Sequence, residues 1–217
     1  MSSARRWSQR PVLVLEASTP NASVALLVDG TVRGTRELRM GASREDALFP
    51  AVVQLLAEGG VAVADLGAVV CGSGPGSFTS LRIAGAMAKG LVQDSSRSLV
   101  AVPSLLLAAA AHGIPGAWLM HADALRGDRY VLPVTIDAEG QVRTDAHTRI
   151  VPATDLTTTF PGMEAVSVRP EAAGLVRVAG WTELPPCDVD GWEPSYGRLA
   201  EAQVQWEATH ARPLPPA

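Results

Sequence analysis

Apolar residues occur along the chain either in short continuous runs, which predict buried strands, or at helical spacing, which predicts helices. Residues 12–15 form a short continuous apolar run, typical of a buried strand. Residues 22–28 and 31–38 flank Asp29 and Gly30, a pair that favours the tight turns joining antiparallel strands, so they predict a β-hairpin. Residues 66–71 predict another buried strand.

Two helices are predicted around that strand. Ser43, followed three residues later by Asp46, resembles a capping box and opens a helix that ends at Gly59 and Gly60. Its apolar residues recur at helical spacing and form one wide stripe: Leu48, Ala51, Val52, Leu55 and Leu56. The second helix, residues 79–93, follows a glycine-rich turn and has almost no polar face.

The second half of the chain repeats this alternation. We expect strands at residues 99–102, 118–121 and 129–136, a helix at 104–112, and a further helix at 170–179 in a region of weaker signal. The pattern predicts an α/β protein with mixed sheets and flanking helices. It also predicts four parts, namely a mobile tail (1–10), an N-terminal lobe (11–100), a smaller C-terminal lobe (101–212) and a short tail (213–217).

The composition narrows the range of functions. Of the 217 residues, 47% are hydrophobic, as in a globular protein. The formal net charge is -4, which disfavours direct, sequence-independent binding to RNA phosphates. Cys71 and Cys187 have no metal-ligand spacing and form no disulfide framework, as suits a reducing cytoplasm. The apolar run after Arg10 is too short for a signal peptide or a membrane span.

The glycine-rich loop of residues 72–82, GSGPGSFTSLR, is the strongest local feature. A loop between a strand and a helix can present backbone N–H groups to an anion, which makes Ser77, Thr79 and Arg82 weak candidates for an anion or nucleotide contact. The loop matches neither GxxxxGK[ST] nor GxGxxG. We therefore favour the alternative, a tight turn shaped by its glycines with Ser77 or Thr79 capping the helix.

No catalytic residue, metal ligand or cofactor is predicted. The histidines are not spaced as a zinc-binding pair, and the serine-containing loop lacks the GxSxG pattern of a nucleophile elbow. Glu16 ends the first strand, where a carboxylate can hold a metal or water, but no nearby glycine lets a phosphate approach the backbone. A structural role for Glu16 is the favoured interpretation.

The helix at 79–93 is apolar on more than one side, so more than one side must pack against other residues. Such cover comes either from the core of the chain or from a partner, and two adjacent apolar helices exceed what a monomer usually exposes. The pattern therefore predicts a partner surface on both helices. Its residues are Leu48, Val52 and Leu55 from the first helix and Ala84, Met87, Ala88 and Leu91 from the second.

Several segments together resemble the TsaB (YeaZ) family. The specific segment is CGSGPGSFTSLRIAGAMAKGL, residues 71–91, and supporting segments are residues 12–30, 43–60, 102–110 and 123–131. A final PxYxR-like element contains Pro194, Tyr196 and Arg198. The likeness covers residues 11–135 well and is thin beyond them.

This resemblance implies a two-lobed fold of the actin, hexokinase and Hsp70 (RNase H-like) type. It also implies a non-catalytic partner of TsaD, the subunit that transfers threonylcarbamoyl to adenosine in the anticodon loop of tRNAs. Family members dimerise with TsaD, or with themselves, through their first two helices, and the ATPase TsaE joins the assembly. The resemblance thus implies that the chain contacts tRNA only as part of the complex.

Two residues depart from the family pattern. Its first strand commonly ends in Asp, here Glu16, and the His that often opens the first helix is here Arg44. Both changes favour the non-catalytic interpretation. The alternative is an active ATP-dependent transferase or metallopeptidase of the same fold, and a small-molecule kinase would need glycines that residues 12–20 and 113–130 lack.

Overall fold

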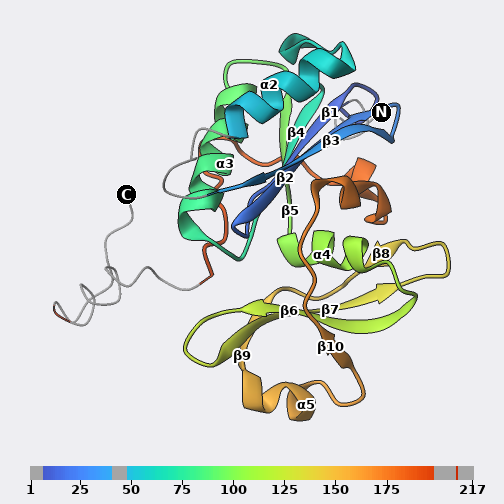
Figure 1. Cartoon of the computed structure of the whole chain (residues 1–217), viewed down its shortest axis with the longest axis vertical. Coiled ribbons are helices and arrows are strands. Elements are labelled where there is room, and N and C mark those ends of the chain that lie inside the picture. The colour runs from blue at the N-terminus through green and yellow to red at the C-terminus, as the bar shows by residue number, and fades with distance from the viewer. Residues whose placement is uncertain (1–6, 41–47, 198–208, 210–217) are drawn as a thin grey trace.

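Two mixed five-stranded sheets, one above the other in Figure 1, form the two lobes of the molecule. The computed structural model describes residues 7–40, 48–197 and 209. The upper sheet has the strand order β3-β2-β1-β4-β5. Its strands are β1 (Val12–Glu16), β2 (Asn21–Val28), β3 (Thr31–Arg39), β4 (Ala68–Gly72) and β5 (Ser98–Val102).

Strand direction in the upper sheet follows from its connections. The β2–β3 hairpin turns at Asp29 and Gly30, whose φ angles of 51° and 73° are those that a tight hairpin turn requires. β1 is antiparallel to β2 but parallel to β4, and β4 is parallel to β5. The two central strands β1 and β4 are buried along their whole length, which explains their continuous apolar runs.

Helices cover both faces of the upper sheet. α2 (Leu48–Gly59) and α3 (Phe78–Val92) pack on one face, where alternate strand residues such as Leu13 and Val69 meet them. α4 (Ser104–His112) packs on the other face, and the same apolar cluster continues into the lower sheet. Because α4 contributes to both lobes, it joins them through one shared core (Figure 1).

The lower sheet is built on a long hairpin. β6 (Gly116–Asp123) and β7 (Asp128–Ile136) pair antiparallel, and β10 (Glu164–Val166) runs parallel to β6. β8 (Val142–Arg143) and β9 (Arg149–Pro152) both pair with β7. A short helix, α5 (Leu156–Thr159), follows, and the 3-10 helices are η2 (Val63–Asp65), η3 (Ala153–Asp155), η4 (Ala172–Arg177) and η5 (Trp181–Glu183).

The predicted elements are largely confirmed, and one helix is corrected. The α/β class with mixed sheets and flanking helices is observed, and α4 has the predicted bounds. The helix expected at residues 170–179 is instead the 3-10 helix η4, where Gly174 lies close against Ala110 of α4. The proposed cap at Ser43 and Asp46 lies outside the described residues, as does Arg44.

Trp7 corrects the predicted extent of the N-terminal tail. Its side chain is buried and its ring lies 6.0 Å from that of Trp181. The backbone around it also packs closely on Gly67, just before β4. The chain is therefore packed from Trp7 onward, four residues before the expected start at Pro11, because an indole offers much apolar area to bury.

The C-terminal segment, residues 186–197, returns to the upper lobe. The N–H of Cys187 donates to the carbonyl of Leu99 on β5 at 2.7 Å, and Glu193 forms an ion pair with Lys89 of α3 at 3.1 Å. This segment was predicted to belong to the C-terminal lobe. A single division near residue 100 therefore does not describe it, and residues 213–217 lie outside the described chain.

The burial of Trp7 leads to a stability prediction. Trp7→Ala should lower the free energy of unfolding by about 3–5 kcal/mol, since it leaves a cavity beside Trp181. Urea denaturation would measure this loss. Ile114→Ala, at a side chain that is 53% exposed, is the matched control and should change stability by less than about 0.5 kcal/mol. A variant at Trp7 as stable as this control would contradict the buried position.

Candidate functional site

Three segments meet at the carboxyl ends of β1 and β4. They are the turn after β1, the glycine-rich loop between β4 and α3, and the start of α4. In open α/β sheets the carboxyl ends of parallel strands are the usual place for a ligand. The candidate site therefore lies where the sequence analysis placed Glu16 and the loop of residues 72–82.

Glu16 is the buried centre of this site. Its side chain is 1% exposed; Oε1 accepts the N–H of Ser18 at 2.6 Å, and Oε2 accepts the hydroxyl of Ser104 at 2.8 Å. Burial raises the pKa of Glu16 above its ordinary value of 4.5, and the hydrogen bonds from Ser18 and Ser104 offset part of that rise. Both carboxyl oxygens are therefore used within the chain, in agreement with a structural role.

Ser104 extends this bonding into the glycine-rich loop. Its Oγ accepts the N–H of Gly74 at 3.0 Å, and its own N–H donates to the carbonyl of Gly74 at 3.0 Å. One carboxylate thus holds the turn after β1 directly, and holds α4 and the loop after β4 through a single serine.

The glycines of the loop are required by close packing. A Cβ at Gly72 would overlap Oε2 of Glu16, and a Cβ at Gly76 would overlap the carbonyl of Ser18. Gly74 has a φ of +86° and packs on the carbonyl of Ser195. These contacts agree with the favoured interpretation of the loop as a tight turn that positions α3.

The three candidate anion contacts are not brought together around an open pocket. The N–H of Ser77 donates to the carbonyl of Ser18 at 2.7 Å, and its hydroxyl pairs with that of Ser80 at 3.0 Å. Thr79 is exposed, and the guanidinium of Arg82 lies 5.4 Å from the centre of the Phe78 ring. An anion contact by Ser77, Thr79 and Arg82 stays a prediction.

The C-terminal segment closes over this loop. The N–H of Ser195 donates to the carbonyl of Ser73 at 2.7 Å, and the ring of Tyr196 lies 4.7 Å from that of Phe78. Gly197 packs directly against the hydroxyl of Tyr130 on β7. The segment therefore bridges the two lobes beside the candidate site, which the sequence pattern did not reveal.

Metal-ligating side chains do not cluster within the described part of the chain, where no three of His, Cys, Asp and Glu could hold one ion. Asp123 accepts a hydrogen bond from Arg129 at 2.8 Å. Burial, with a contribution from Arg129, lowers the pKa of His121. Cys71 and Cys187 are both free thiols.

The residues predicted to face a partner need correction. Five of them are at most 2% exposed and belong to the core between the helices and the upper sheet: Leu48, Val52, Leu55, Ala84 and Ala88. The reason is that their stripes face the sheet itself. Met87 and Leu91 are partly exposed. The apolar side chains that α2 presents to solvent are instead Phe49 and Val53, which are 61% and 49% exposed.

α3 is apolar on several sides for a reason internal to the chain. Beyond its core-facing side, Gly85 packs against Pro194 and Trp192 of the C-terminal segment. The sequence did not decide whether the core or a partner covers this helix. On this flank, residues of the same chain cover it. The exposed pair on α2 was detectable as a second apolar spacing of four residues, Phe49 to Val53, outside the main stripe.

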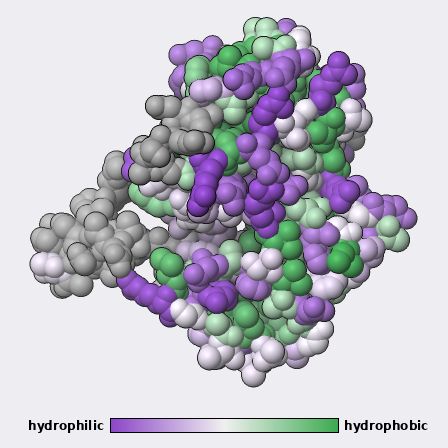
Figure 2. All heavy atoms as spheres, viewed as in Figure 1, coloured by the Kyte–Doolittle hydropathy of each residue, from purple (hydrophilic) through white to green (hydrophobic). Residues whose placement is uncertain are grey.

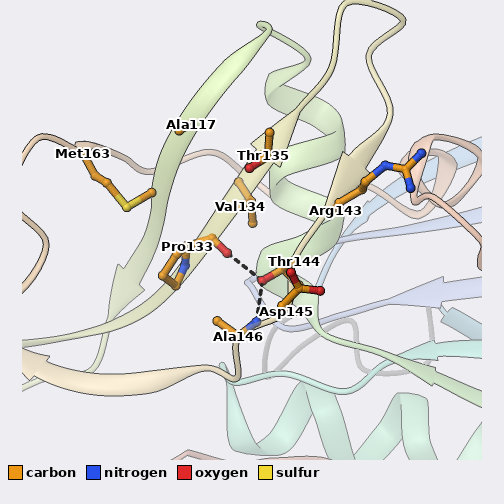
Figure 3. Close-up of a pocket in the computed structure, with 9 residues that line it drawn as sticks. All are labelled: Ala117, Pro133, Val134, Thr135, Arg143, Thr144, Asp145, Ala146 and Met163. Atoms are coloured by element: carbon orange, nitrogen blue, oxygen red, sulfur yellow. Dashed lines mark hydrogen bonds between the residues drawn. The ribbon is translucent and has the colours of Figure 1, made fainter.

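A separate cavity of about 380 Å³ opens on the lower lobe (Figure 3). Its lining residues are Ala117, Pro133, Val134, Thr135, Arg143, Thr144, Asp145, Ala146 and Met163. The hydroxyl of Thr144 donates to the carbonyl of Pro133 at 2.7 Å and accepts the N–H of Ala146 at 3.1 Å. The cavity holds none of the predicted site residues.

Among the described residues, no helix combines the length and the apolar character needed to cross a lipid bilayer.

The chain is similar to several known proteins. A family model described as "TsaD: tRNA N6-adenosine threonylcarbamoyltransferase" matches residues 42–164, more than half of the chain. The tRNA threonylcarbamoyladenosine biosynthesis protein TsaB of Escherichia coli is 31% identical over 59% of this chain and 57% of that protein. TsaB of Bacillus subtilis is 26% identical over 90% of this chain and 97% of that protein.

Coverage differs among these relatives. The chain spans 57% of the E. coli protein and 39% of the Haemophilus influenzae TsaB, which is 31% identical in the shared part. Among solved structures, YeaZ from Pseudomonas aeruginosa has a TM-score of 0.70, with 26% identity over 85% of this chain and 98% of that one. The likeness agrees with the two-lobed fold class that the resemblance implies.

The packing of the glycine-rich loop leads to a matched pair of substitutions. Gly76→Ala should lower the free energy of unfolding by about 2 kcal/mol or more, since its Cβ meets the carbonyl of Ser18. Gly90→Ala, in α3 with open space around it, should raise stability by up to about 1 kcal/mol. Thermal denaturation compares the two. A Gly76 variant of normal stability would contradict this close packing.

The raised pKa of Glu16 predicts a pH dependence. The folded state keeps the proton in a range where the unfolded chain has released it, so stability from this group declines as pH rises from 4.5 through the raised pKa. Glu16→Gln cannot ionise and should lack this decline. Urea unfolding of both proteins across a pH series would show it, and a wild-type stability that rises relative to the variant over that range would contradict it.

Proposed function

The chain belongs to the TsaB (YeaZ) group of the TsaD family, and on this premise we propose that it is a non-catalytic partner of a TsaD-like subunit. That subunit would transfer the threonylcarbamoyl group to adenosine in the anticodon loop of tRNAs. The chain itself would supply a docking surface.

The exposed apolar surface of α2 is the observation that carries this proposal. Phe49 and Val53 lie one helical turn apart and are about half or more exposed. On neighbouring α3, Ile83 and Met87 are only partly buried and border the same core. Figure 2 shows apolar side chains reaching the surface of the upper lobe. A partner with a similar helix pair would bury these side chains.

The bonding of Glu16 supports a role without chemistry. A general acid, base or metal ligand needs a carboxylate that can reach a substrate or an ion. Here Ser18 and Ser104 occupy both oxygens, and the residues around them exclude solvent from the carboxylate. This arrangement favours a part in holding the fold over a part in the reaction.

Further partners follow from the same proposal. A TsaE-like ATPase would join the assembly, and a second copy of this chain would compete with the TsaD-like subunit for the helices. With a formal net charge of -4, the chain would meet tRNA only as part of the complex. The cytoplasm is the proposed compartment.

An active enzyme of the same fold is the second candidate, since the family model that matches carries the description of a transferase. It would be an ATP-dependent transferase or a metallopeptidase. The two candidates differ in what the chain does alone: an enzyme turns over substrate by itself, whereas a partner raises the activity of another subunit.

Val53→Glu tests the docking surface. The side chain is exposed, so the variant should fold, but the new carboxylate would be buried without a counter-charge in the complex. Association with the TsaD-like subunit of the same cell should weaken by about tenfold or more, measured by analytical ultracentrifugation. Transfer of threonylcarbamoyl to tRNA should fall with it in a reconstituted assay.

Val63→Glu is the matched control, because Val63 is 38% exposed and belongs to η2 rather than to either helix. Circular dichroism would confirm that both variants are folded. A folded Val53 variant with normal association would move the interface elsewhere, and threonylcarbamoyl transfer by this chain alone would favour the enzyme. A charge at Ala88 is unsuited to this test, since that residue is buried in the core.

A further inference from the structure

The edge strands of the two sheets are protected in different ways. In the lower sheet they are short, since β8, β9 and β10 have two, four and three residues. In the upper sheet, the outer edge of β5 is covered by the chain itself, because the carbonyl of Leu99 accepts the N–H of Cys187 at 2.7 Å. Short strands and covered edges are the usual means by which a protein keeps other chains from pairing with its sheets.

β3 has neither protection. It has nine residues and pairs with β2 on one side, and within the described residues no segment pairs with its other side. A β-bulge opposite Leu26 and Leu27 interrupts its first part, so the regular edge runs from Gly34 to Arg39. An unpaired edge of this length is a template for a strand from another chain.

The hydrogen bonding to β2 fixes which backbone groups of β3 point outward. The N–H of Met40 donates to the carbonyl of Pro20 at 2.7 Å, so these two residues form a hydrogen-bonded pair of the antiparallel ladder. Along such a ladder, bonded pairs alternate with pairs that are not bonded to each other. Thr35, Glu37 and Arg39 therefore occupy the non-bonded positions, and their N–H and C=O groups point away from β2.

Two of these outward positions carry opposite charges. Glu37 and Arg39 are exposed, and their side chains lie on the same face of β3 because they are two residues apart. Glu37 is also held in place, since Arg169 donates to both of its carboxylate oxygens at 2.8 Å. A row of like charges would keep two copies of this edge apart, whereas a Glu and an Arg can each face the other in an antiparallel copy.

We propose that a second copy of this chain pairs antiparallel with β3, edge to edge, in a register centred on Leu38. Glu37 of each copy then lies opposite Arg39 of the other, and both residues use their outward backbone groups. Registers centred on Glu37 or on Arg36 would instead place like charges opposite each other. The dimer would be weak and reversible, because the edge is short. This surface is β3 rather than α2 or α3, so the inference goes beyond the proposed function and does not depend on it.

Arg39→Glu tests this register. The change places a carboxylate opposite Glu37 at both symmetry-related positions, so self-association should weaken by about tenfold or more. Arg33→Glu is the matched control, since it makes the same change of charge on the same strand but lies outside the regular edge. Its self-association should stay within about twofold of the wild type. Sedimentation velocity across a concentration series would measure both, with circular dichroism to confirm folding.

A mixture of two variants tests the pairing directly. Glu37→Arg alone places arginine opposite arginine and should also self-associate weakly. It loses the ion pair with Arg169, but that pair is largely exposed, so the variant should fold. Mixed with the Arg39→Glu variant, it presents the opposite charge at each facing position. Association between the two variants should therefore return to within about threefold of the wild type.

The proposal is overturned if the wild-type chain stays monomeric throughout the concentration series, or if the Arg39 and Arg33 variants self-associate equally. Loss of self-association in Val53→Glu, beside normal self-association of Arg39→Glu, would place the second copy on α2 and overturn it as well. Failure of the wild-type chain to bind the TsaD-like subunit would count against the proposed function alone, since self-association is measured without that subunit.

Discussion

The buried carboxylate of Glu16 is the constraint on which the centre of this molecule depends. Desolvating a carboxylate is costly unless its oxygens are bonded, and here Ser18 and Ser104 supply those bonds. Because Ser104 also bonds the backbone of Gly74, one side chain sets the relative positions of β1, β4 and α4. Both lobes share α4, so this bonding also bears on how they meet.

This arrangement favours the interpretation of the glycine-rich loop of residues 72–82 as a structural turn. Its glycines let the backbone approach Glu16 and Ser18, where a phosphate loop would let it approach a ligand. The C-terminal segment then packs over the same loop through Ser195 and Tyr196. Atoms of the chain itself thus fill the surroundings of a carboxylate that could otherwise serve a reaction.

The exposed apolar side chains of α2 have a simple origin. Phe49 and Val53 are exposed because α2 is apolar on more than the side that packs on the sheet. The stripe on one side completes the core of the upper lobe, and the pair on the other side forms the docking surface that we propose.

The sequence by itself determined the order and type of most elements. Buried strands such as β1 and β4 must be apolar on both faces, and a tight hairpin needs residues such as Asp29 and Gly30. These features can therefore be predicted from short stretches of the sequence. The helical stripe containing Leu48 and Val52 was equally visible. Only the tertiary structure decided that this stripe faces the sheet rather than a partner, and that residues 186–197 cover one flank of α3. The physical reason is that periodicity shows which residues share a face but not what covers it, since the covering segment can be distant in sequence, as Glu193 is from Lys89, 104 residues earlier.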